Sequence, residues 1–199
     1  MGSIGGHVGG NMFFGNAFNA RSYLHHHEMF DLINGHGLDI SFLGAAEIGE
    51  DGSVNVSRIA GRVQGSGGFV NIASSTRKLV FLSSFTVGGK STGENGHLVV
   101  QEQGKPGKFL KKVDQISFNG NDAARRGQEI VYITERAVFK LIDGKVTLME
   151  YADGMDLQKD ILDFMEFKPE ISPDLKKMPV YCFEDGLIGI KQKWESLEA

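Results

Sequence analysis

The residues best suited to chemistry in this sequence are five consecutive positions, Gly65-Ser66-Gly67-Gly68-Phe69. Glycine leaves backbone amides unobstructed, so such a segment can hold a phosphate or stabilise an oxyanion. A plain tight turn has the same composition, and the spacing alone does not separate these two interpretations. The segment is therefore a candidate anion-binding loop.

A second glycine-rich segment, MGSIGGHVGG, opens the chain. Backbone with this much glycine normally follows a strand and then turns sharply or approaches a ligand. Only Met1 precedes Gly2. The sequence therefore predicts either a loose tip or a loop whose preceding strand lies upstream of these 199 residues.

The other chemically active residue types lack a recognisable pattern. Three adjacent histidines occupy positions 25–27, but neighbouring side chains diverge on a helix or strand, so we expect a solvated turn and no metal site. Within Thr134-Glu135-Arg136 we expect Glu135 to form an ion pair, with Arg136 or across the strands, rather than to act in catalysis. Cys182 is the one cysteine, which excludes an internal disulfide and predicts a small packed side chain.

Length and composition indicate one soluble globular domain spanning residues 1–199. The apolar fraction is 41% and the charged fraction 23%, both ordinary values for a folded chain. A net charge of −4 argues against broad capture of nucleic acid. No spanning apolar run and no charged-then-apolar leader is evident, so we expect no membrane association and a cytoplasmic location.

The elements that must position the glycine loop follow an α/β order. An apolar stretch at 38–48 predicts a strand buried on both faces, and 53–59 predicts a short strand. A glycine turn and a short helix are expected at 65–78, followed by a second buried strand at 78–87. This order predicts an open, mainly parallel sheet with helices, whose ligands bind at the carboxyl ends of the strands.

Beyond residue 95 the pattern becomes β-rich. Alternating β-branched segments at 96–104, 111–120 and 129–151 predict strands. Asp143-Gly144 predicts a two-residue hairpin turn, since both residue types tolerate positive φ. Helical spacing at 155–165, bounded by Pro169 and Pro173, predicts a helix.

Four stretches together resemble family I coenzyme A-transferases, and specifically the carboxyl-terminal (β) half of the acetate, propionate or 3-oxoacid type. They are LDISFLGAAEIGEDGSVNVS, GRVQGSGGFVNI, VYITERAVF and GMDLQKDILDFMEFKPEISPDL. The resemblance implies the α/β fold that these enzymes share with the NagB and RpiA sugar-phosphate isomerases.

The resemblance also implies a mechanism. The family's Glu-x-Gly-x-x-Gly loop carries a glutamate that forms a thioester with CoA in a ping-pong reaction. Laid over Gly2-Ser3-Ile4-Gly5, this motif puts the glutamate one position before Met1, outside this sequence.

Other roles carried over from the family fall on the glycine loop and its surroundings. Gly67 and Gly68 are expected to present catalytic amides to the thioester, and Asn55 to orient the acyl group or the glutamate. The residues expected to contact CoA are Gly65, Ser66, Phe69, Gly2 and Gly5.

The implied partners are acyl-CoA, a short-chain carboxylate and the amino-terminal (α) half, in the same chain or another, within a homo- or hetero-oligomer. CoA is a substrate, and no tightly bound cofactor is expected. Alone, the chain is expected to show no turnover. Two alternatives remain: a noncatalytic module for CoA binding or assembly with an α partner, and a sugar-phosphate isomerase or sensor on the related fold.

Overall fold

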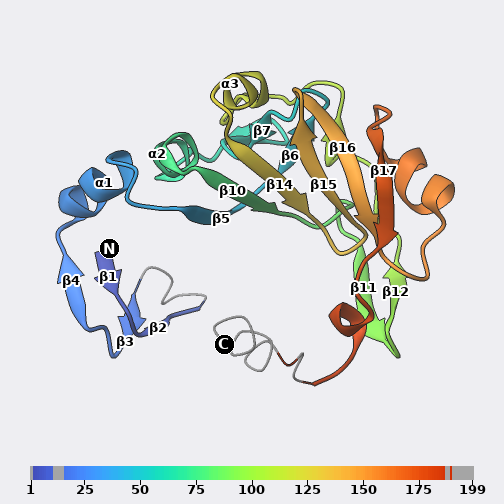
Figure 1. The fold of residues 1–199 in the computed structure, drawn as a ribbon, viewed down its shortest axis with the longest axis horizontal. Coiled ribbons are helices and arrows are strands. Elements are labelled where there is room, and N and C mark those ends of the chain that lie inside the picture. The colour runs from blue at the N-terminus through green and yellow to red at the C-terminus, as the bar shows by residue number, and fades with distance from the viewer. Residues whose placement is uncertain (1, 11–15, 187–188, 190–199) are drawn as a thin grey trace.

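The computed structural model describes residues 2–10, 16–186 and 189. Its centre is a six-stranded sheet with the order β17-β16-β15-β14-β10-β5 (Figure 1). The members are β5 (Ile40–Gly44), β10 (Lys78–Leu82), β14 (Glu129–Ile133), β15 (Ala137–Ile142), β16 (Lys145–Tyr151) and β17 (Glu170–Lys177).

Parallel and antiparallel pairing divide this sheet as the sequence predicts. β10 pairs in parallel with both β5 and β14, and β17 pairs in parallel with β16. The later section, β14-β15-β16, is an antiparallel meander. The expected α/β fold, with a mainly parallel sheet and a β-rich later section, is confirmed.

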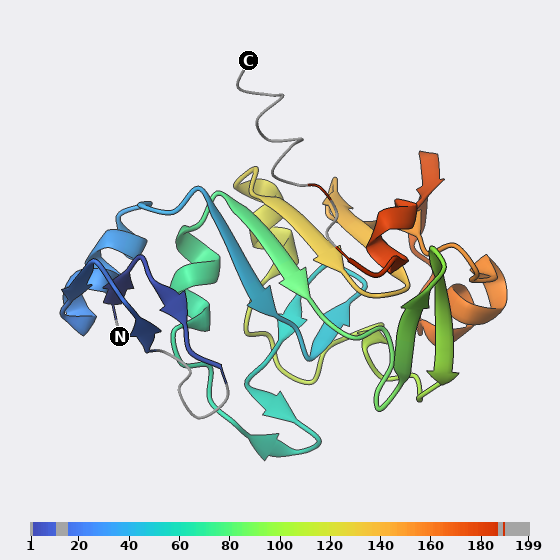
Figure 2. The ribbon, with the colours of Figure 1, turned by 90° about the horizontal axis from the view of Figure 1, so that it is seen from below.

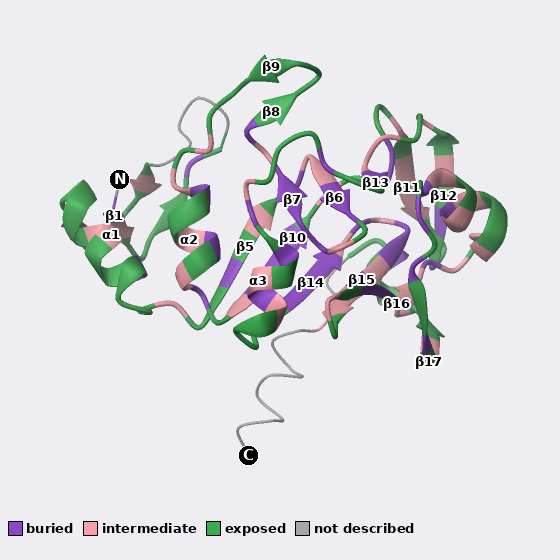
Figure 3. Ribbon diagram, turned by 90° about the horizontal axis from the view of Figure 1, so that it is seen from above, coloured by how far each residue is buried: buried purple, intermediate pink, exposed green. Residues whose placement is uncertain are grey.

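One face of the sheet carries the core. The helices α2 (Phe69–Ser75) and α3 (Gly120–Arg125) lie on the same side of it in Figure 1. The small sheet β13-β6-β7 packs there too, through the ring pair Phe109–Phe139, and Phe118, which bridges to Val54 of β7, packs its ring on Phe81. Its strands are β6 (Glu47–Gly49), β7 (Val54–Asn55) and β13 (Phe109–Leu110). Burial is concentrated in β10 and β14, drawn in purple in Figure 3.

The strand predicted at 38–48 is wrong in extent and burial. The chain forms β5, which ends at Gly44, and then the separate short strand β6. Among the described strands β5 pairs only with β10, at the sheet edge. Its residues therefore alternate: Ser41 is buried, whereas Ile40 and Phe42 are 43% and 62% exposed on the other face.

Two further predictions need correction. The segment 111–120 contributes a single bridge from Phe118 to Val54 and no strand among its residues. Cys182 is exposed rather than packed, because it lies in η4 (Val180–Phe183), a short 3-10 turn near the end of the described chain.

Other local predictions are confirmed. Asp143 and Gly144 have φ of 50° and 75°, the values of a tight hairpin turn between β15 and β16. Residues 157–164 are helical, as the π-helical segment η2 (Leu157–Ile161) followed by the 3-10 turn η3 (Leu162–Phe164). Pro173 lies within β17, an edge strand, where a missing backbone donor is tolerated.

An amino-terminal unit, which consists of the strands β1 to β4 and the helix α1 (His26–Asn34), packs beside α2 (Figure 2). The solvated turn expected at 25–27 is instead the exposed start of the helix α1, where the His25 amide donates to Glu28 Oε2 at 2.8 Å. Two hairpins, β8–β9 and β11–β12, complete the fold. The remaining strands are β1 (Gly2–Ile4), β2 (His7–Val8), β3 (Ala17–Phe18), β4 (Ser22–Leu24), β8 (Arg58–Ile59), β9 (Arg62–Val63), β11 (Lys90–Glu94) and β12 (His97–Glu102).

No described helix is both long enough and apolar enough to cross a membrane.

Candidate active site

The loop 65–68 is fixed at both ends. On one side the amides of Gln64 and Gly65 donate to the Ser57 carbonyl oxygen at 2.8 and 3.3 Å. On the other side the buried ring of Phe69 lies 5.9 Å from that of Phe81, centroid to centroid. Phe69 therefore anchors the loop in the core, and any contact of this residue with CoA would have to use its backbone.

The backbone of this loop requires glycine. Gly65 and Gly67 have φ of 79° and 52°, in the left-handed region that favours glycine. A Cβ on Gly68 would lie 2.8 Å from Phe30 Cζ of α1, so no larger residue fits without displacing that ring.

The amides of Ser66, Gly67 and Gly68 remain available to a ligand. None of them donates a hydrogen bond to another described residue, whereas the neighbouring amides of Gly65 and Phe69 do. Gly67 is exposed, and Ser66 and Gly68 are partly exposed. Three adjacent unpaired donors can hold an anionic oxygen without a side chain.

Asn55 is fully buried and fully hydrogen-bonded. Its Oδ1 accepts from the amides of Ser57 and Arg58 at 3.0 and 3.1 Å. Its Nδ2 donates to Glu47 Oε2 at 2.8 Å and to the Arg58 carbonyl oxygen. With both ends of the amide in use, Asn55 shapes the turn that leads to the glycine loop.

Sequence reasoning did not single out Glu47, the partner of Asn55. The two residues face each other across the antiparallel pair β6–β7. The turn 50–52 that joins these strands was the available signal, because a tight turn brings the residues on either side into register.

The first glycine segment begins with β1, which lies beside the helix α1. Gly2 is buried in β1, where a Cβ would lie 3.0 Å from both Leu24 Cβ and Met29 Cβ. Gly5 has φ of 69° and is exposed beside the Arg21 side chain. Met29 and Phe30 are neighbours on α1, so this one helix contacts both Gly2 and Gly68.

The predicted ion pair of Glu135 is present, with Oε1 3.6 Å from Arg136 Nε. The guanidinium of Arg136 is 1% exposed and lies over the rings of Phe85 and Phe164. Burial lowers its pKa, and the nearby Glu135 opposes that effect. This arrangement joins strands and loops and gives no sign of catalysis.

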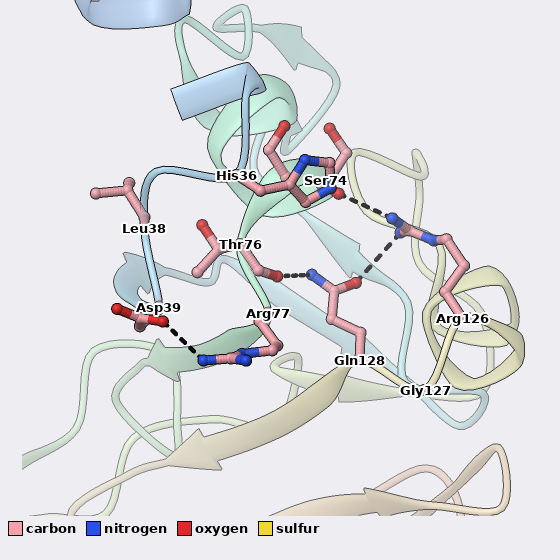
Figure 4. Close-up of a pocket in the computed structure, with 10 residues that line it drawn as sticks. His36, Leu38, Asp39, Ser74, Thr76, Arg77, Arg126, Gly127 and Gln128 are labelled. Atoms are coloured by element: carbon pink, nitrogen blue, oxygen red, sulfur yellow. Dashed lines mark hydrogen bonds and ion pairs between the residues drawn. The ribbon is translucent and has the colours of Figure 1, made fainter. Parts of the chain in front are cut away.

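A cavity of about 430 Å³ lies at the opposite edge of the sheet (Figure 4). Its lining segments 36–39, 74–77 and 126–128 precede β5, β10 and β14, so it adjoins the amino ends of those parallel strands. Arg77 is paired with Asp39 at 2.7 Å, and Arg126 donates to the Ser74 carbonyl oxygen at 2.8 Å. These contacts hold the end of α2, so we assign the cavity no ligand.

Comparison with known proteins identifies CoA-transferases among the relatives of this chain. The chain is 44% identical over 203 residues to caffeate CoA-transferase of Acetobacterium woodii, a match spanning 100% of this chain and 37% of that protein. The thioester complex of Escherichia coli YdiF with CoA has a TM-score of 0.88 and 39% identity, over 94% of this chain and 36% of that one. The chain belongs to the family I CoA-transferases.

A match to the B subunit of a related enzyme agrees with the prediction that this chain is the β half of a family member. The chain is 26% identical over 140 residues to one subunit of a probable succinyl-CoA:3-ketoacid coenzyme A transferase from Bacillus subtilis, spanning 69% of this chain and 55% of that polypeptide. Against the caffeate enzyme and YdiF, the chain spans little more than a third of their length. No protein-family model matches it.

Proposed function

We propose that this chain is the β-type part of a short-chain acyl-CoA:carboxylate CoA-transferase that works through a glutamyl-CoA thioester. The observation that carries the proposal is the set of three unpaired amides at Ser66, Gly67 and Gly68. The relation to YdiF, which has been observed as a thioester with CoA, supports the covalent intermediate.

The chemistry explains why a carboxylate needs such a loop. The glutamate oxygen bonds to the thioester carbonyl carbon, and the C–S bond breaks as CoA leaves as a thiolate. The thiolate then attacks the glutamyl carbonyl of the resulting anhydride, which releases the first acid as a carboxylate and leaves glutamyl-CoA. A second carboxylate reverses these steps with a new acyl group.

Each attack places negative charge on a carbonyl oxygen. Amides held in advance toward that oxygen stabilise it, and the loss of one such donor typically costs about 10²–10³ in kcat. In this proposal Gly67 and Gly68 supply the donors. Gly65, Ser66 and the exposed Gly5 line the path of CoA, whereas the buried Gly2 packs β1 against α1, and Phe69 and Asn55 keep the loop in place.

The attacking glutamate is, in this proposal, supplied from outside these 199 residues, together with the amino-terminal half that forms much of the acyl pocket. The test is to measure CoA exchange between acetyl-CoA and propionate, with the chain alone and after mixing with an amino-terminal half that carries the glutamate. Exchange is expected only in the mixture. Binding of the two halves without any exchange would favour the noncatalytic assembly module instead.

A further inference from the structure

A row of polar side chains crosses the small sheet β7-β6-β13 on its outer side. Asn55 lies opposite Glu47 in register. The Ile48 amide donates to the Lys108 carbonyl oxygen, and Phe109 lies opposite Ile48, so Lys108 is the neighbour of Glu47 on the next strand. Because side chains alternate along a strand and Ile48 and Phe109 point into the core, Glu47 and Lys108 share the opposite face.

The carboxylates near Lys108 already have other donors. Glu47 Oε2 accepts from Asn55 Nδ2 at 2.8 Å and from the Asp114 amide at 2.9 Å. Glu135 Oε2 accepts from the Phe85 amide at 2.9 Å, and its Oε1 faces Arg136.

The ammonium group of Lys108, by contrast, makes no hydrogen bond or ion pair with any of the described residues. Two other cations near this row, Arg58 and Arg136, are paired with Asp114 and Glu135. Lys108 is half-buried, and desolvation lowers its pKa, against the attraction of Glu47 and Glu135. An anionic oxygen placed against this group would offset its desolvation.

The row lies on the functional edge of the fold. Glu47 stands three residues beyond Gly44, the end of β5, and Glu135 two residues beyond Ile133, the end of β14. Ligands of open α/β sheets bind at these carboxyl ends. The same row is joined to the glycine loop, since Asn55 binds the amide of Ser57 and Ser57 accepts from Gly65.

We propose that Lys108 binds an anionic oxygen of the substrate, either the carboxylate of the acyl acceptor or a phosphate of CoA. Glu47 and Glu135 hold the ammonium group in position without neutralising it by direct contact. This inference rests on the proposed CoA-transferase function, and it adds a side chain that recognises the substrate to a site otherwise built from backbone amides.

The test measures binding to the 199-residue chain by calorimetry, with acetate, CoA and pantetheine, which lacks the phosphates of CoA. The variants are Lys108→Met, Lys108→Arg and, as a matched control, Lys112→Met, which alters an exposed lysine just beyond β13. Thermal unfolding checks that each variant is folded.

Lys108→Met is expected to weaken binding about tenfold or more, with Lys108→Arg partly restoring it and Lys112→Met without effect. Weaker binding of acetate identifies the acyl carboxylate as the ligand. Weaker binding of CoA but not of pantetheine identifies a phosphate.

Equal binding by Lys108→Met and the unaltered chain would overturn the inference, and so would no binding of any of these ligands to the unaltered chain. The outcome is separable from that of the proposed function. If binding depends on Lys108 but the reconstituted enzyme shows no CoA exchange, only the proposed transferase function is contradicted. If exchange occurs but Lys108→Met binds the ligands as well as the unaltered chain does, only this inference is contradicted.

Discussion

Asn55 shows how a single buried amide can hold a turn in place. Its side-chain amide accepts two hydrogen bonds and donates two. Three of them join it to the turn that precedes the glycine loop, and the fourth joins it to Glu47 of β6. The family resemblance predicted that Asn55 orients the acyl group or the glutamate, whereas in the structure its amide is fully used in hydrogen bonds within the protein. The turn 50–52 signals the pairing of Asn55 with Glu47, but Lys108 comes beside Glu47 through the register of β13 with β6, which are far apart in the sequence and carry no local signal for it.

We predict that Asn55→Ala lowers the free energy of unfolding by about 2–3 kcal/mol, because it leaves the amides of Ser57 and Arg58 without their acceptor. Urea unfolding measures the change. Asn71→Ala is the control: its exposed hydrogen bond to Asn34 should be worth under about 0.5 kcal/mol. Equal stability of Asn55→Ala and the unaltered chain would show that this network does not hold the turn.

A second prediction about a single residue concerns the buried side chain of Tyr132. Its hydroxyl donates to the Gly52 carbonyl oxygen at 2.6 Å, and burial, with a smaller contribution from Asp51, raises its pKa well above the usual range. In the unfolded chain this tyrosine ionises near pH 10, while in the folded chain it stays protonated. Stability from Tyr132 is therefore complete below about pH 10 and falls as the pH rises further.

Tyr132→Phe removes both the hydrogen bond and this titration. At about pH 8 we expect the free energy of unfolding of the variant to be about 1–2 kcal/mol below that of the unaltered chain. When the pH rises from about 8 to about 11, the unaltered chain should lose about 1 kcal/mol more stability than the variant does. Urea unfolding at the two pH values checks this. An identical alkaline loss in both proteins would refute the assigned cause.

At the scale of elements, the start of α3 depends on close backbone contact. A Cβ on Gly120 would lie 2.1 Å from the Asp51 carbonyl oxygen and 2.5 Å from Gly52 C. These are backbone atoms of the loop between β6 and β7, and they cannot rotate away as a side chain could.

We predict that Gly120→Ala costs about 2 kcal/mol or more, as overpacking against rigid structure does. The matched control is Gly44→Ala in β5, where a Cβ meets nothing within 4 Å. Thermal unfolding compares the two. If Gly120→Ala unfolds at the same temperature as the control, the packing of α3 on this loop has been misassigned.

The sequence predicted some elements better than others, for a physical reason. β10, the β15–β16 hairpin and the helix α2 carry strong local signals: an apolar run, a two-residue turn and a glycine entry. Of the strand predicted at 78–87, however, only the part up to Leu82 forms. The pairs β6–β7 and β8–β9 are two or three residues long and depend on side-chain contacts such as those of Asn55. The one-sided burial of β5 depends on which strands pair with it, which local hydrophobicity does not reveal.

At the scale of the whole molecule, a chain of contacts joins the first glycine segment to the glycine loop and the loop to the polar row. α1 contacts Gly2 and Gly68, and Asn55 connects the glycine loop to Glu47 and Lys108. The family relation predicted from sequence is confirmed by relatives 44% and 39% identical to the chain. The roles of the individual site residues stay predictions.

The most direct measurement removes one loop amide without changing any side chain. Replacing Gly68 by glycolic acid converts its N–H to an ester oxygen, and the same change at Gly88, an open exposed turn, is the control. In the transferase reconstituted with its amino-terminal half, we predict that the Gly68 ester lowers kcat about 100-fold while the Gly88 ester leaves it unchanged. Full activity of the Gly68 ester and of the same change at Gly67 would contradict a catalytic role for these amides.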